Sequence, residues 1–193
     1  IDILRQTRIF REEYLLRENS ERAIAHSLSN AIYKQLIGKV GCYNTKIAYV
    51  VVSKIDSSRL YSIIISDFDG YNGQEILNSR HPILSLAWSR RGKKIAYVSF
   101  ESGRSLIYVQ DLKNGERKKI AYGDGIMGAP EFSLDDKSII FTASISGNID
   151  LYKYNLIENK FTRLTKSEAI ETEASLSPDC LLYTSPSPRD SNL

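Results

Sequence analysis

The five residues Lys46-Ile-Ala-Tyr-Val50 return unchanged as Lys94-Ile-Ala-Tyr-Val98, and a weaker copy follows as Ser138-Ile-Ile-Phe-Thr142. A second motif, an aromatic or leucine residue followed by serine, recurs at positions 88, 132 and 176, a constant step of 44 residues. Its copies are Ala87-Trp88-Ser89, Glu131-Phe132-Ser133 and Ser175-Leu176-Ser177. Two motifs that recur in step indicate an internal structural repeat.

Within each repeat the apolar residues alternate with polar ones, which is the pattern of half-buried β-strands. Glycine and asparagine separate the alternating runs, as at Asn114-Gly115 and Gly147-Asn148, where tight turns require them. Four short strands in every 44 residues are typical of β-propeller blades. We therefore predict a mainly β protein with a partial propeller of about three four-stranded blades over residues 44–179. A plain antiparallel sandwich is the alternative.

Residues 1–43 lie before the repeat and have a different pattern. The stretch 9–18 predicts a strand, and Asn19 or Ser20 can cap a helix that runs to about Ile37, with glycines just beyond. Apolar residues of this helix recur at every fourth position: Ile24, Leu28, Ile32 and Leu36. A strand followed by an amphipathic helix predicts the C-terminal part of a small α/β domain.

Two motifs that suggest a ligand are better explained as turns. Gly123-Asp-Gly125-Ile-Met-Gly128 matches G-x-G-x-x-G, but a dinucleotide site needs this motif to open a helix, and the repeat places it between strands. Asp67-Phe-Asp69-Gly70 lacks the third acidic residue and the final glutamate of a calcium loop. His26 and His81 have no cysteines at zinc-ligand spacing, and no nucleophile elbow occurs. We predict no catalytic residue, no metal and no cofactor.

The composition limits the classes of partner. Hydrophobic residues make up 42% and charged residues 25% of the chain, and the net charge is +3. Basic residues are dispersed except for one short cluster, Arg90, Arg91, Lys93 and Lys94, so a nucleic-acid surface is not predicted. No apolar run reaches the length that spans a membrane, so no membrane insertion is predicted.

Three segments closely resemble the TolB family, the periplasmic propeller proteins of the Tol-Pal system. They are SDFDGYN at 66–72, AYVSFESGRS at 96–105 and AHSLSNAIYKQLIG at 25–38. The blade turns also resemble degraded copies of the propeller motif W-S-P-D-G, of which Ser177-Pro178-Asp179 is the best preserved. The resemblance extends from Ile1 to Asp179. It implies an α/β domain followed by a six-bladed, non-enzymatic propeller that binds the outer-membrane lipoprotein Pal and the inner-membrane-anchored TolA, linking the envelope layers during constriction.

The resemblance also implies where Pal binds: on loops at one mouth of the propeller, just before each aromatic-serine strand. The matching positions are Leu84 and Ser85 in one blade, Ile126, Met127, Gly128 and Ala129 in the next, and Thr172 and Glu173 in the third. Small residues there allow close backbone approach, and Ile126 and Met127 are expected to offer apolar contact. Ordinary packing of inter-strand turns is the alternative at each position. The TolA-binding segment and about half of the propeller are expected to lie outside this sequence.

The last fourteen residues, Cys180 to Leu193, break the repeat where it requires a strand. Their sequence, CLLYTSPSPRDSNL, resembles the translation of a transposon-end adaptor used in sequencing libraries. We interpret residues 180–193 as a non-native tail and exclude them from inference about the fold. Cys42 is then left without a predicted disulfide partner.

Two other functions remain open at this stage. The repeat could be the propeller of a prolyl-oligopeptidase-like serine peptidase whose catalytic domain lies elsewhere, or a free-standing propeller for an unknown ligand. The helix before the first blade favours the TolB family over the peptidase. Because an incomplete ring leaves strand edges and apolar faces uncovered, we also expect the chain to fold poorly by itself.

Overall fold

The computed structural model describes residues 11–15, 17, 20–121, 123–145, 147–166, 170–171 and 174–177, and the backbone of 183–184. One helix and thirteen strands occur in these residues. The chain divides into two compact units, one formed by Ile1–Ala48 and Ile65–Gln74 and the other by Tyr49–Ile64 and Glu75–Leu193. Each unit is described by itself.

Helix α1 (Glu21–Ile37) of the first unit has the predicted bounds. Gly38 ends it in the left-handed region (φ 77°), and its N–H donates to the carbonyl of Lys34 at 2.8 Å. Ser20 holds the N-cap position, but its hydroxyl bonds to the backbone of Arg17 instead of to a helix N–H. The apolar face of α1 has no fully buried residue. Within the described part of the chain, no helix is long and apolar enough to cross a membrane.

The strand predicted over residues 9–18 is wrong for residues 11–15, which have no regular secondary structure. A strand is stabilised by backbone hydrogen bonds to a neighbour, and no described strand pairs with this segment. The rest of the predicted strand lies outside the described residues, apart from Arg17, which is also irregular.

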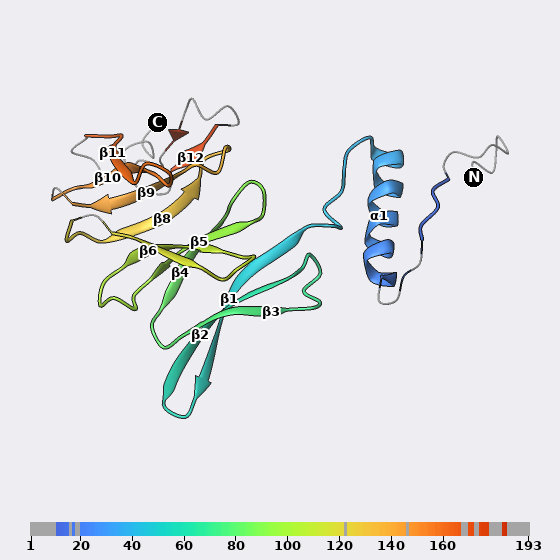
Figure 1. The fold of residues 1–193 in the computed structure, drawn as a ribbon, viewed down its shortest axis with the longest axis horizontal. Coiled ribbons are helices and arrows are strands. Elements are labelled where there is room, and N and C mark those ends of the chain that lie inside the picture. The colour runs from blue at the N-terminus through green and yellow to red at the C-terminus, as the bar shows by residue number, and fades with distance from the viewer. Residues whose placement is uncertain are drawn as a thin grey trace, which may run out of the picture. The chain divides into compact units, whose positions relative to one another are not determined.

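The strands follow the predicted repeat closely (Figure 1). They are β1 (Lys46–Ile55), β2 (Ser58–Asp67), β3 (Gln74–Ser79), β4 (Ile83–Trp88), β5 (Lys94–Ser99), β6 (Leu106–Asp111), β7 (Arg117–Ile120), β8 (Met127–Phe132), β9 (Ser138–Ser144), β10 (Ile149–Asn155), β11 (Lys160–Arg163), β12 (Ser175–Leu176) and β13 (Tyr183–Thr184). They form sheets in the orders β1-β2-β3, β4-β5-β6-β7, β11-β10-β9-β8 and β12-β13. The partial propeller is confirmed, with two complete four-stranded blades.

The blades are offset by one strand from the repeat seen in the sequence. In the sequence, the repeat copy that starts at Lys46 ends with the residues of β4. In the structure, β4 pairs instead with β5 of the next copy, with Trp88 opposite Ile95. The short link between β3 and β4 carries the chain to the next sheet, whereas β4 and β5 are joined by a tight turn. The innermost strand of each complete blade therefore comes first in its sheet.

The recurring serine of the blade motif stabilises this tight turn. The Ser89 hydroxyl accepts hydrogen bonds from the N–H groups of Lys93 and Lys94, and the Ser133 hydroxyl accepts one from Ser138. Both serines are buried. A buried hydroxyl that satisfies backbone donors explains why the repeat retains serine at this position.

The core lies within and between the blades. Ile95, Tyr97 and Ile107 of one blade are fully buried, as are Phe141 and Leu151 of the next. Strand β8 contacts β4, β5 and β6, so its residues pack against the preceding blade. Burial on both faces of these strands follows from the packing of neighbouring blades, and it exceeds the half-burial that alternation alone predicts.

The turn after β8 is also tied to the preceding blade. Asp136 stands 44 positions after Gly92, and both residues have left-handed backbone, with φ of 59° and 65°. The Asp136 carboxylate accepts hydrogen bonds from the N–H groups of Arg90 and Arg91 at 2.5 and 3.1 Å. Aspartate tolerates the conformation that glycine supplies in the other copy, and it adds a contact between blades.

Candidate partner-binding site

Strands β4 and β8 share a β-bulge at the same point of the repeat. The register shifts between Leu84 and Ala87 in β4 and between Gly128 and Glu131 in β8. Ser85 and Ala129, 44 positions apart, have φ of 51° and 42° at these bulges. Left-handed backbone at a non-glycine residue costs on the order of 1 kcal/mol or more and tends to occur at functional sites. Two copies of this strain indicate a selected feature.

The two bulges border a single pocket of about 320 Å³ in the second unit. Its lining comes from both innermost strands and from the segment before β12: Ser85, Leu86, Ala87, Ala129, Pro130, Glu131 and Ala174. The structure thus brings together Ser85 and Ala129, two of the residues predicted to bind a partner. Sequence reasoning missed Glu131, because its position in the repeat gave no sign that it lines a pocket.

The other predicted residues separate into exposed and buried ones. Leu84 and Ile126 are 51% and 57% exposed and can contact a partner. Met127 is 3% exposed, so the expectation that it offers apolar contact is wrong. Its backbone N–H donates to Ser105, which fixes β8 against the preceding blade and turns the side chain inward. Gly128 is half-buried.

Thr172 and Glu173, the predicted positions of the third blade, lie outside the described residues. Their predicted role remains a prediction.

The G-x-G-x-x-G segment begins after β7, and its last residues, Met127 and Gly128, open β8. It leads into a strand and not into a helix, so it lacks the context of a dinucleotide site. Gly125 has a steric role, because a Cβ atom there would overlap the backbone of Ser144. These glycines shape the turn that presents Ile126.

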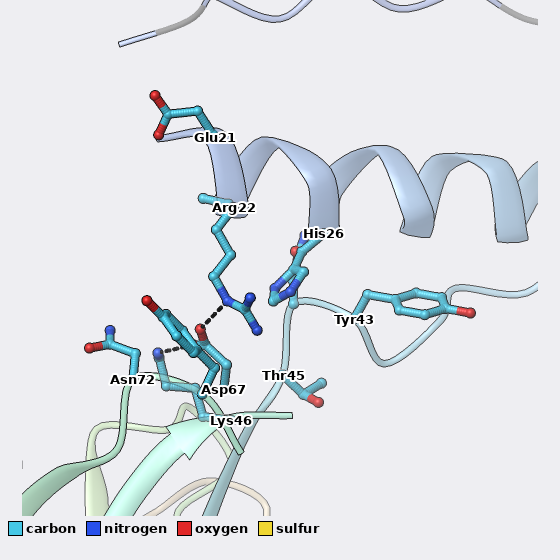
Figure 2. A pocket seen from close by; sticks show the side chains of 11 residues that line it. Glu21, Arg22, His26, Tyr43, Thr45, Lys46, Asp67 and Asn72 are labelled. Carbon is cyan, nitrogen blue, oxygen red and sulfur yellow. Dashed lines mark hydrogen bonds and ion pairs between the residues drawn. The ribbon is translucent and has the colours of Figure 1, made fainter. Parts of the chain in front are cut away.

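A second pocket, which is polar and has a volume of about 590 Å³, lies within the first unit, between α1 and the SDFDGYN segment (Figure 2). Arg22 contacts the carboxylates of Asp67 and Asp69, and its guanidinium lies 4.1 Å from the centre of the Tyr71 ring. Lys46 bonds to Asp67 at 2.8 Å. The acidic residues that suggested a calcium loop are therefore paired with cations of the same chain.

Aromatic contacts complete this junction. The ring of His26 meets that of Phe68 edge-on at 5.1 Å, and Tyr43 meets Phe68 in the same way at 5.4 Å. In the part of the chain that the structure describes, no group of three or more His, Cys, Asp or Glu residues could hold a metal. The segment that most strongly suggested the family thus attaches the helix to the ends of β1 and β2 within this unit.

Lys46→Met should raise the pKa of Asp67 toward its ordinary value. The hydrogen bond from Lys46, followed by its charge and by Arg22, holds the pKa of Asp67 below that value. A carboxyl with a lowered pKa stabilises the folded state above its unfolded pKa, and this contribution is lost as the pH falls through the folded pKa. Carboxyl ¹³C titration measures the shift. Lys39 is exposed in the loop that follows α1, so the control Lys39→Met should leave the pKa of Asp67 unchanged.

Comparison with known proteins identifies close relatives. The family model described as "TolB beta propeller domain" matches residues 33–190. The chain is 39% identical over 167 residues to the Tol-Pal system protein TolB of Ruthia magnifica, and 44% identical over 129 residues to that of Methylococcus capsulatus. These alignments cover 86% and 67% of this chain, but 39% and 30% of the relatives.

The crystal structure of TolB from Acinetobacter baumannii superposes with a TM-score of 0.88 at 39% identity, covering 97% of this chain and 47% of that one. An acylaminoacyl peptidase of Pyrococcus horikoshii matches 68% of this chain and 25% of its own with a TM-score of 0.51. At 15% identity the latter likeness shows the fold alone. The chain spans less than half the length of the relatives it matches.

Proposed function

The chain belongs to the TolB family, and from this premise we propose that its propeller is a non-enzymatic, periplasmic surface for a Pal-type outer-membrane lipoprotein. The pair of strained bulges at Ser85 and Ala129 supports this proposal best. Both positions were expected from the resemblance to contact Pal, and they border one pocket.

The mouth offers the mixture of features that suits a protein partner. Leu84 and Ile126 are exposed apolar side chains beside a pocket with small residues on its wall. Protein interfaces combine an apolar centre with a polar rim, and small residues allow the partner backbone to approach. We assign Met127 and Gly128 to shaping the mouth, and Thr172 and Glu173 to its continuation in the next blade.

In the whole protein this surface would act together with a TolA-type inner-membrane partner and so connect the two membranes during cell division. The relatives are named for the Tol-Pal system, which supports this role. The peptidase-propeller alternative is supported by likeness of fold alone.

The test is a calorimetric titration of the 193-residue chain with the soluble domain of a Pal-type lipoprotein. We expect saturable binding that Leu84→Asp together with Ile126→Asp weakens by about tenfold or more, because apolar contacts at the interface centre are lost. Ile157→Asp is the control, since Ile157 is also exposed but lies in the turn between β10 and β11. Circular dichroism first establishes that the chain is folded. Absence of binding by the folded chain, or equal losses in both variants, would contradict the proposal.

A further inference from the structure

We infer that the pocket between β4 and β8 receives a cationic side chain, lysine or arginine, of the protein partner, with Glu131 as its counter-charge. The inference rests on the proposed function and specifies the chemistry of one part of the binding surface. It starts from the contrast between Glu131 and the rest of the pocket.

Glu131 is the charged member of an otherwise small and apolar lining. Among the described residues around the pocket, the others are alanine, leucine, proline and serine. Pro130 has no N–H to offer, and a leucine or alanine side chain cannot form a hydrogen bond. The carboxylate and the hydroxyl of Ser85 are therefore the side-chain groups of this lining that can form hydrogen bonds with a guest.

The charge is particular to this blade. The positions 44 residues before and after Glu131 are Ala87 and Ser175, so the repeat does not require an acidic residue here. The same strand position serves the fold with a methyl group in one copy and a hydroxyl in another. A role in binding would explain why this copy alone of the three carries a carboxylate.

No cation among the described residues pairs with this carboxylate. The ion pairs of the described residues do not include Glu131, and its Oε1 accepts a long hydrogen bond of 3.4 Å from the N–H of Leu176. A partly buried carboxylate with spare acceptor capacity favours a guest that supplies both positive charge and N–H donors. Lysine and arginine supply both.

The bulges make the pocket accessible to such a side chain. They turn the backbone at Ser85 in β4 and at Ala129 in β8, and both residues line the pocket. The exposed side chains of Leu84 and Ile126 precede the bulges on the same two segments and can cover the aliphatic part of the guest. Excluding water from the pocket strengthens the attraction between the carboxylate and the cation.

The first test uses the soluble domain of the Pal-type lipoprotein and the full chain. Glu131→Gln should lower affinity by roughly thirty-fold, the lower end of what truncation of one member of a buried charge pair costs. Glu158→Gln, at an exposed turn position, is the matched control and should bind normally. Circular dichroism checks that both variants fold. Replacing the partner's lysines and arginines by glutamine one at a time should identify one whose loss has no further effect in Glu131→Gln.

The second test does not require the lipoprotein. The peptide acetyl-Gly-Arg-Gly-amide should shift the amide resonances of Ala87, Ala129 and Ala174 in the wild-type chain, and much less in Glu131→Gln. The same peptide with norleucine in place of arginine should not shift these resonances in either protein. Failure of lipoprotein binding together with a positive peptide result would reject the proposed partner only. Equal peptide shifts in both proteins, or lipoprotein binding that is insensitive to Glu131→Gln, would overturn the inference.

Discussion

Arg163→Met is expected to destabilise the folded chain by roughly 3–5 kcal/mol, the cost of removing one partner from a buried ion pair. Asp150 is fully buried, and its Oδ2 accepts a hydrogen bond from Arg163 at 2.6 Å. The other carboxylate oxygen of Asp150 is buried and has no hydrogen-bond partner among the residues that the structure describes. Without Arg163, a charged carboxylate would stay in the interior with nothing to neutralise it.

Urea unfolding at about pH 7 measures the loss of stability in Arg163→Met. Lys153→Met is the control, because Lys153 is exposed on the same strand. Asp150→Asn combined with Arg163→Met should recover part of the stability at neutral pH. A loss no larger than that of the control would show that the ion pair does not stabilise the fold.

The strands of the propeller could be predicted because local and global signals agree. The repeated motifs at 94–98 and 138–142 begin β5 (Lys94–Ser99) and β9 (Ser138–Ser144). Alternation, turn residues and the serine motif each act within a few residues of the chain. When local and global signals agree in this way, the strands can be predicted from the sequence.

The assignment of strands to sheets needed longer-range information. The repeat has the same period wherever its start is placed, so it cannot show that β4 belongs with β5 and not with β3. The structure settles this through the register of Trp88 opposite Ile95. The burial of Met127 could not be predicted for a similar reason. An apolar residue beside a turn can point toward solvent or toward the core, and the local sequence does not show which.

The site could be predicted only in outline. Resemblance gave Ser85 and Ala129, but neither the left-handed backbone there nor the pocket has a local sequence signal, since serine and alanine are not turn-specific residues. Glu131 could have been found by comparing the three copies position by position and asking why one of them carries a charge.

The interpretation of residues 180–193 as a non-native tail stays a prediction. Most of these residues lie outside the described part of the chain. The backbone of Tyr183–Thr184 forms β13, which pairs with β12. A peptide spanning Cys180 recovered from the native protein by mass spectrometry would show that the tail is genuine.

Gly125→Ala is expected to have the second large effect, acting on both stability and binding. An added Cβ would overlap the carbonyl oxygen of Ser144 and lie 3.1 Å from the nitrogen of Ile145, so backbone must move. Overpacking of this kind typically costs about 1–3 kcal/mol, and more where the obstacle is backbone. The turn also carries Ile126, whose carbonyl accepts a hydrogen bond from Ser144 at 3.0 Å. Displacing Ser144 should therefore displace a residue proposed to contact the partner.

Gly103→Ala separates this steric effect from the backbone preference of glycine. Gly103 has φ of 81° and open space where its Cβ would be, so its replacement should cost only the left-handed penalty of about 1 kcal/mol. We expect Gly125→Ala to have the lower urea midpoint and the weaker affinity for the Pal-type domain, although its own backbone is not left-handed. If Gly103→Ala lowered the urea midpoint and the affinity as much as Gly125→Ala does, steric overlap would not be the reason for glycine at position 125. The expected order instead assigns to Gly125 the close approach of two backbones that positions the mouth of the propeller.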